Sequence, residues 1–286
     1  MKTRAILAIL LCACIAGTSG IFIKYMTTMD SGSLAWMRTG IPVLLILPFI
    51  LYKRLGFFRS NPRMVLIASG LNATRMFLFF MAFIYTSIGT AIITLYTWPI
   101  WVSILGAIFL KEDFRIQQWI FLLTAFVGII IAYSDQTFSL ADRDFVGILA
   151  AVGSAFFYSW TVIVFKKEIK NYHPLEIVFY QNLIGAVVFF PFLWMIMPSV
   201  DVTHLQVGVC YALIVGVGVF GLFFYGLNYL KASVASSLMY VEVVSAIVLS
   251  YLILDDQLSP RMMMGGSLIL ISSFMITRLN AEKGQA

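Results

Sequence analysis

Ten long stretches of mostly apolar residues follow one another along this 286-residue chain, separated by short polar segments. At 1.5 Å of rise per residue, about 20 helical residues cross the roughly 30 Å hydrocarbon core of a bilayer. The ten stretches cover approximately residues 5–26, 34–52, 64–87, 89–110, 116–133, 145–165, 175–197, 205–228, 232–254 and 262–277. The sequence therefore predicts ten transmembrane helices.

The composition supports a membrane protein. Hydrophobic residues make up 61% of the chain and charged residues 11%, whereas soluble domains contain about 45–50% and 25%. Too few polar residues are present to cover a water-soluble core of this size. The expected fold class is therefore an all-α polytopic membrane protein. The joints at 87–90 and 230–233 are so short that each must connect two antiparallel helices.

The distribution of Lys and Arg orients the predicted helices. If the N-terminus is cytoplasmic, 14 of the 19 basic residues fall in cytoplasmic segments and two, Arg143 and Arg261, fall on the opposite face. Because cytoplasmic loops carry the excess of positive charge, both termini are predicted to be cytoplasmic. The first 26 residues resemble a secretion signal, but the apolar run is long enough to remain as the first helix. The net charge of +6 reflects this bias and requires no nucleic-acid partner.

The two halves of the chain resemble each other. A shift of 144 residues aligns 82–114 with 226–258 without a gap, so that Tyr96 matches Tyr240 and the acidic Glu112 matches Asp256. Each half would contain five helices. Because five is odd, the second half enters the membrane with the opposite polarity, which is the pattern of inverted-repeat transporters.

We therefore expect two units and a tail. The first five-helix repeat covers residues 1–134, the second and inverted repeat covers 142–279, and a cytoplasmic tail covers 280–286. A shift of 143 residues also sets Arg38 opposite Gln181. Inverted repeats suit alternating access, in which two halves rock about a site near the bilayer midplane.

Several short patterns, taken with this repeat, resemble the drug/metabolite transporter superfamily in its ten-helix EamA-type branch. They are Arg38 early in the second helix, the joint at 85–91, Pro99, and the acidic closing segments at 110–113 and 254–257. One departure is that Glu242 is followed by Val243, where the family usually has Glu-Pro. This removes the proline that would bend the ninth helix. The resemblance implies export of small metabolites, often amino acids or related compounds, across a bacterial cytoplasmic membrane through a central cavity.

Two charged residues lie near the middle of predicted helices, Arg75 in the third and Glu242 in the ninth. A charge at the bilayer centre costs at least about 2.5–3.5 kcal/mol, so each must face a cavity or a partner. Arg75 could bind a carboxylate through its planar fork while Glu242 meets an ammonium group, which favours a zwitterionic substrate. Glu242 could also exchange a proton for the substrate. A structural ion pair and a gating pair are the alternatives.

Aromatic and polar residues complete the candidate site. On one face of the fourth helix and one face of the ninth, which we expect to face each other, lie Thr94, Trp98, Trp101 and Leu105, and Leu238, Glu242, Ser245 and Leu249. The candidate substrate-binding or gating residues are Arg75, Glu242, Trp98, Trp101, Tyr96, Trp160, Arg38 and Gln181. For any single aromatic residue, helix or lipid packing is the ordinary alternative. Lys24 and Arg38 lie nearer the outer interface, where snorkelling is expected.

Other motifs are better explained by packing. The segment 216–221 fits GxGxxG but lies inside an apolar helix, so it indicates helix packing or bending. Cys12, Cys14 and Cys210 fit neither a metal site nor a disulfide framework.

We expect no cofactor and no ATP hydrolysis, because the chain contains no P-loop. An intramembrane enzyme would need a nucleophile–base cluster that the sequence does not show. A lipid flippase remains an alternative, and the sequence leaves open whether the chain is a monomer or a homodimer.

Overall fold

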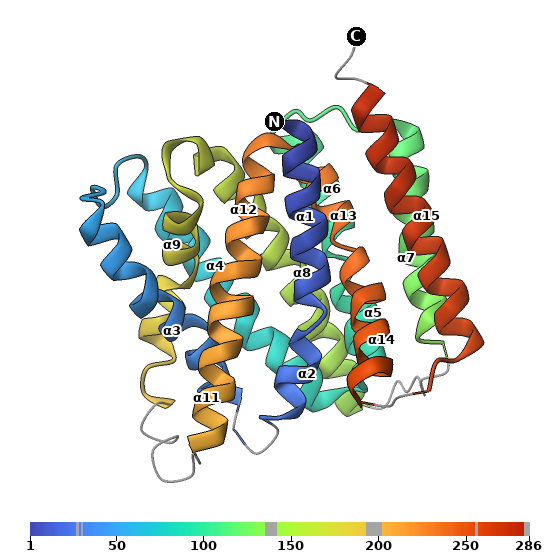
Figure 1. Ribbon diagram of the computed structural model, residues 1–286, viewed down its shortest axis with the longest axis horizontal. Helices are drawn as coiled ribbons and strands as arrows, with labels where there is room; N and C mark the ends of the chain where they lie inside the picture. The colour runs from blue at the N-terminus through green and yellow to red at the C-terminus, as the bar shows by residue number, and fades with distance from the viewer. Residues whose placement is uncertain (27–28, 30, 135–141, 193–201, 255–256, 283–286) are drawn as a thin grey trace.

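The chain folds into closely packed helices (Figure 1). This computed structural model describes residues 1–26, 29, 31–134, 142–192, 202–254 and 257–282. The elements are α1 (Lys2–Ala16), α2 (Ser19–Lys24), α3 (Ser31–Tyr52), α4 (Pro62–Tyr85), α5 (Ile88–Leu95), α6 (Trp98–Phe109), α7 (Ile116–Ala132), α8 (Asp142–Glu168), η1 (Ile169–Asn171), α9 (Pro174–Val188), α11 (Val202–Tyr211), η2 (Ala212–Val219), α12 (Phe220–Tyr229), α13 (Ala232–Leu238), α14 (Val241–Leu254) and α15 (Pro260–Glu282). All regular structure in the described residues is helical, which confirms the all-α expectation.

Eight helical segments within the described residues are long and apolar enough to cross a membrane. Two shorter apolar helices, α7 with 17 residues and α9 with 15, lie where the fifth and seventh spans are expected. The expected seventh span reaches residue 197, and residues 193–197 lie outside the described part of the chain. The structure therefore supports a polytopic membrane protein, while the count of ten spans and the inverted repeat stay predictions.

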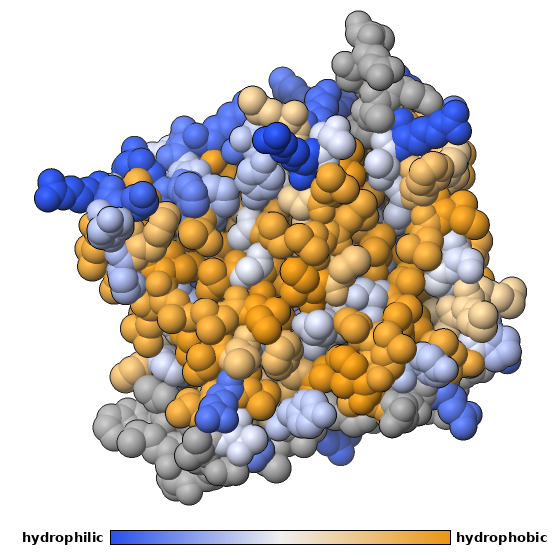
Figure 2. Space-filling model, in the orientation of Figure 1, coloured by the Kyte–Doolittle hydropathy of each residue, from blue (hydrophilic) through white to orange (hydrophobic). Residues whose placement is uncertain are grey.

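The start of α1 and the end of α15 lie at the same end of the molecule (Figure 1). Hydrophilic residues gather at this end and an apolar band crosses the middle of the molecule, as Figure 2 shows. The last helix runs to Glu282, beyond the expected end at residue 277. The cytoplasmic tail from residue 280 stays a prediction, and residues 283–286 lie outside the described part.

Polar contacts connect the segments that we expect on the cytoplasmic side. The Glu112 carboxylate, just after α6, accepts hydrogen bonds from the backbone N–H of Ala232 at 2.6 Å and of Ser233 at 3.1 Å. The Ser233 hydroxyl also donates to it, at 2.7 Å. Lys166 donates to the carbonyls of Leu227 and Leu230 at the end of α12. These contacts satisfy exposed helix ends, and those of Glu112 join the first half of the chain to the second.

Two of the expected spans are interrupted near their middle. The fourth span divides into α5 and α6 at Tyr96 and Thr97, and the ninth divides into α13 and α14 at Met239 and Tyr240. Pro99 follows the first break, as expected for a proline in the first turn of a helix. The second break forms without a proline, so the departure from the Glu-Pro pattern does not leave this helix continuous.

The eighth span contains the π-helical segment η2 between α11 and α12. Gly216 lies in this segment against α3, where an added Cβ would be 2.7 Å from Pro42 Cγ. The structure therefore confirms that the glycine-rich segment serves helix packing and local bending. Such π segments frequently mark functional positions in helices.

Candidate functional site

Arg75 projects from the middle of α4 into an aromatic environment. Its guanidinium carbon lies 4.4 Å from the centre of the Tyr158 ring and 5.7 Å from that of Phe79. Its hydrogen-bond partner among the described residues is the weakly accepting Met76 sulfur, 3.7 Å from Nη1. Ring faces stabilise a cation but leave the N–H groups in its plane available. The guanidinium fork is therefore free to bind an oxyanion.

Glu242 lies in the first turn of α14, directly after the break in the ninth span. Its carboxylate interacts electrostatically with the Arg75 guanidinium and with the phenol of Tyr96. The positive end of a helix dipole favours a carboxylate at such a position. The interrupted helix therefore places a carboxylate in the interior without needing a direct ion pair.

Arg75 and Glu242 are neighbours without being bonded to each other. Their charges interact, but the structure places no ion-pair contact between them within 4.0 Å. An ion pair of that length does form between Arg59 and Glu176, at 2.5 Å, near the end of the molecule that carries the chain termini. In this conformation, a directly bonded structural pair does not describe Arg75 and Glu242.

Tyr96 and Tyr240, which the 144-residue shift pairs, meet at the two helix breaks. The Tyr240 hydroxyl donates to the Tyr96 carbonyl at 3.1 Å, and the ring centres are 6.3 Å apart. The carbonyl of Tyr96 lies at the end of α5, where helical carbonyls lack an intrahelical partner. The contact therefore joins the two interrupted spans at corresponding positions.

Trp98 lies behind Tyr158 as seen from Arg75. Its side chain is 7% exposed, and its ring contacts Tyr158 with a centre-to-centre distance of 4.8 Å. Phe223 lies on another side of it at 6.3 Å. These contacts place Trp98 one ring away from the Arg75 guanidinium, so that it supports Tyr158.

Trp101 and Trp160 belong to another group of rings. Trp101 contacts Phe156 at 5.6 Å, and Trp160 contacts Phe109 at 4.7 Å and Phe156 at 6.4 Å. Phe109 and Phe156 are exposed by 44% and 36% on the surface of the helices. Because apolar residues on that surface face lipid, the ring contacts of Trp101 and Trp160 are typical of packing. The structure does not show them beside Arg75.

Arg38 corrects one expectation from the sequence. Snorkelling predicted an exposed guanidinium, but Arg38 is 4% exposed and its guanidinium carbon lies 4.5 Å from the centre of the Phe220 ring. Its Nη1 atom has no hydrogen-bond partner among the described residues. Gly216 lies beside this guanidinium, since a Cβ built on it would be 3.5 Å from Nη1. Lys24 has the same predicted depth, and its side chain lies outside the described part.

Gln181 connects α9 to α4 through Asn72. Asn72 donates to the Gln181 backbone carbonyl at 3.0 Å, and Gln181 Nε2 donates to Asn72 Oδ1 at 3.3 Å. Both side chains are buried, and the pairing satisfies the Gln181 amide nitrogen and the Asn72 side chain, while Gln181 Oε1 has no hydrogen-bond partner among the described residues. The geometry indicates a structural contact at this position.

The expected facing surfaces of the fourth and ninth spans form only in part. Ser245 instead donates to the Cys14 carbonyl at 2.6 Å, so this face of α14 meets α1. The sequence also did not single out Tyr158 and Phe220, which contact the two arginines. Aromatic residues are numerous throughout the chain, and their helical spacing gave no signal that separated these two from the others.

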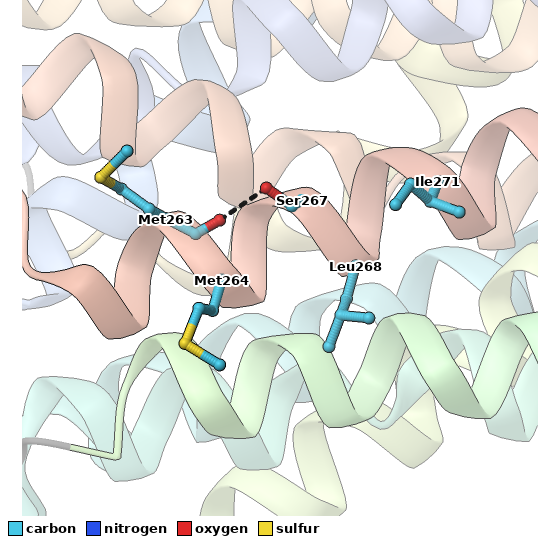
Figure 3. Close-up of a pocket in the computed structure, with 5 residues that line it drawn as sticks. All are labelled: Met263, Met264, Ser267, Leu268 and Ile271. Atoms are coloured by element: carbon cyan, nitrogen blue, oxygen red, sulfur yellow. Dashed lines mark hydrogen bonds between the residues drawn. The ribbon is translucent and has the colours of Figure 1, made fainter.

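Two surface grooves lie away from this cluster. One is a shallow groove along α15, lined by Met263, Met264, Ser267, Leu268 and Ile271 (Figure 3). The other lies between α3 and α9 and is lined mainly by apolar residues. Met263 and Met264 are more than half exposed, so the groove along α15 belongs to the lipid-facing surface. Neither groove includes a candidate residue.

Among the described residues, no group of three or more His, Cys, Asp or Glu side chains is placed to hold a metal ion. Cys12 lies at a helix contact, where its thiol is 3.1 Å from the Val219 carbonyl and 3.7 Å from the Met239 sulfur. These contacts fit the packing role expected for a small buried residue. The site therefore consists of charged and aromatic side chains.

Comparison with known families gives two matches along the chain. The model of the EamA-like transporter family matches residues 3–134 and residues 145–278. A solved structure described only as a protein crystal structure has a TM-score of 0.85 and 16% identity, and the match covers 100% of both chains. At this identity, the structural match establishes the fold alone.

Three relatives have names that state a family or a function. Solute carrier family 35 member G1 of Mus musculus is 24% identical over 186 residues, which cover 61% of this chain and 50% of the relative, so the chain spans about half of its length. An S-adenosylmethionine uptake transporter of Rickettsia felis is 24% identical, with coverage of 62% and 59%. A pseudopaline exporter of Pseudomonas aeruginosa is 23% identical, with coverage of 68% and 67%.

Proposed function

Because the chain belongs to the EamA-like transporter family, we propose that it exports a small zwitterionic metabolite, an amino acid or a close derivative, by alternating access. In this proposal Arg75 binds the carboxylate and Glu242 meets the ammonium group. The bacterial cytoplasmic membrane is the proposed location. The substrate class rests on the site, since relatives of this identity differ in the direction and the compound that their names give.

One observation carries this proposal: two opposite charges lie near each other in the interior without a direct bond. The Arg75 fork has a sulfur as its hydrogen-bond partner among the described residues, and the Glu242 carboxylate interacts with it from the start of α14. A zwitterion between them would give each charge a counter-ion. Buried charges require such partners, and a substrate that supplies them is bound specifically.

Alternating access requires contacts that break and form between the halves. The Glu112 contacts with Ala232 and Ser233 hold one end of the molecule together in this conformation. The two interrupted spans meet at Tyr96 and Tyr240, which supports a pivot between the repeats near the site. Discontinuous helices at the repeat interface are typical of secondary transporters. Glu242 supplies a group that can exchange a proton for the substrate.

Substitution of Arg75 by Lys tests the role of the guanidinium. Lysine retains the charge but loses the planar fork, so Arg75→Lys should weaken binding of an amino acid at least tenfold. The matched amide, which lacks the carboxylate, should lose much less. Binding of both compounds is measured with the purified protein in nanodiscs. Equal losses for the acid and the amide would contradict the proposed carboxylate contact.

A second pair of variants tests the structural alternative. If Arg75 serves only to neutralise Glu242, Arg75→Ala should lower the unfolding temperature strongly, and the double variant with Glu242→Gln should recover much of the loss. Under the proposed function, the empty protein gains little from the second change, because the two groups are not directly bonded. Thermal unfolding without ligand distinguishes the two outcomes.

Two other functions are alternatives to this proposal. The same fold could export or import another small metabolite or a cationic drug-like compound, and aromatic rings such as Tyr158 could bind a cation. A lipid flippase would use a lateral groove such as the one between α3 and α9. Transport of headgroup-labelled lipid in liposomes, together with no effect of Arg75→Lys, would favour the flippase.

A further inference from the structure

Arg38 is a buried cation to which the proposed function assigns no role. Its side chain is 4% exposed, and its Nη1 atom has no hydrogen-bond partner among the described residues. Tyr211 is a side-chain hydrogen-bond partner of the guanidinium, and the phenols of Tyr158 and Tyr211 are its favourable electrostatic neighbours. A buried charge normally requires a counter-ion or a full set of hydrogen bonds. The Phe220 ring and the Tyr211 phenol stabilise the cation, but neither carries a negative charge and Nη1 stays without an acceptor.

The charges in this interior cluster do not balance. Arg75 interacts electrostatically with both Arg38 and Glu242, so this cluster contains two guanidinium groups and one carboxylate. The buried carboxylate of Glu176 is paired with Arg59. Repulsion between Arg38 and Arg75 adds to the desolvation of each. A ligand with one negative charge in total would neutralise the cluster.

The Nη1 atom of Arg38 is a donor without an acceptor among the described residues. Phe220 covers one face of the guanidinium, and a ring on the face leaves the N–H groups in the plane free. Gly216 lies beside Nη1, and a Cβ built there would be 3.5 Å from that atom. The unpartnered Nη1 atom therefore lies beside Gly216 of the π-helical segment η2.

We propose that Arg38 binds a second anionic group of the substrate, so that the carried compound has two carboxylates and one ammonium group. Small amino dicarboxylic acids have this chemistry. Arg75 and Glu242 hold the amino-acid end, and Arg38 holds the carboxylate of the side chain or of the N-substituent. The inference rests on the proposed function and specifies its substrate class.

The test compares acids with neutral partners of nearly the same shape. The probes are aspartate with asparagine, glutamate with glutamine, and N-carboxymethylalanine with N-methylalanine, each measured for binding to the full chain in nanodiscs. In at least one pair, the diacid should bind at least tenfold more tightly than its neutral partner. In Arg38→Gln this preference should fall below threefold, while Arg38→Lys should keep part of it because the charge remains.

The outcomes distinguish failure of the Arg38 proposal from failure of the proposed function. Binding of the neutral partners without preference for the diacids would overturn the role of Arg38 and leave the zwitterion site intact. A preference for diacids that survives in Arg38→Gln would also overturn it. If no compound of either class binds, both proposals fail.

The stability of the empty protein gives a second readout. Under this proposal Arg38 lacks a counter-ion in the free protein and its Nη1 atom lacks an acceptor, so Arg38→Gln should keep or raise the unfolding temperature. The diacid should then stabilise the unchanged protein more than the variant, since a ligand stabilises the state that binds it. A large loss of stability in the empty variant would show that Arg38 is a structural residue and would overturn the proposal.

Discussion

The chemistry of the interior depends on how single side chains are turned. Arg75 lies over Tyr158, whose ring in turn makes an edge-to-face contact with Trp98, so a cation and two rings form one continuous series of contacts from α4 through α8 to α6. Such aromatic contacts hold a guanidinium by shape as well as by charge. Loss of one ring should therefore weaken the positioning of the cation that it supports.

Trp98→Ala tests the contact series of Arg75, Tyr158 and Trp98. Removal of a buried Trp costs about 3–5 kcal/mol when the cavity cannot collapse, and Tyr158 would lose its support. We expect transport in vesicles to fall at least tenfold per inserted molecule. Trp101→Ala, a ring change three residues along the same helix, is the matched control and should lose less. Equal transport by the two variants would remove Trp98 from the site.

Two elements are shaped by where small residues and helix ends meet their neighbours. The π segment η2 allows α3 to approach because Gly216 has no side chain. The N-terminus of α13 is held by Glu112 from the first half of the chain. Both features are local in sequence and depend on a distant partner in space.

Gly216→Ala should destabilise the protein by about 1–3 kcal/mol, because overpacking a tight contact has this cost. The added Cβ would lie 2.7 Å from Pro42 Cγ. Gly218→Ala is a control in the same segment, since its Cβ would lie 3.5 Å from the Leu213 carbonyl, an ordinary contact. Thermal unfolding of both variants measures the difference. A similar change in both would attribute the effect to the π segment itself.

Glu112→Ala should lower the stability of this conformation. Two backbone N–H groups and the Ser233 hydroxyl would lose their acceptor, and loss of a helix cap costs about 0.5–2 kcal/mol. Because the contact joins the two halves, a cysteine introduced near the cytoplasmic end should also react faster with a thiol reagent. Glu168→Ala, which loses one contact to Asn171, is the control. Unchanged labelling would show that the contact does not close this end.

At the scale of the whole molecule, the start of α1 and the end of α15 share one side (Figure 1), and hydrophilic residues are concentrated there (Figure 2). With positively charged segments in the cytoplasm, a C-terminal fluorescent-protein fusion should be bright and a C-terminal alkaline phosphatase fusion inactive. The opposite pair of results would reverse the proposed orientation and with it the direction of transport.

The sequence determined the class of the protein because apolar length and loop charge are properties of the chain itself. Windows of about 20 apolar residues require a bilayer whatever their neighbours are, and the family pattern follows the order of the residues. The resemblance to EamA-type transporters is accordingly confirmed by the family match. Arg75 and Glu242 were found in the same way, because a charge in an apolar window is costly wherever the helix packs.

Tertiary structure alone decided which side chains meet. Helical spacing assigns a residue to a face but does not identify the helix opposite it, so Ser245 contacts α1 and the ring contacts of Trp101 and Trp160 are with Phe109 and Phe156. Depth along a helix predicted that Arg38 snorkels, yet it lies inward beside Gly216 and Phe220 of a distant span. No proline accompanies the helix break before Glu242, so the sequence gives no local signal for that break. Each of these features depends on contacts between residues far apart in the chain, which the local pattern does not contain.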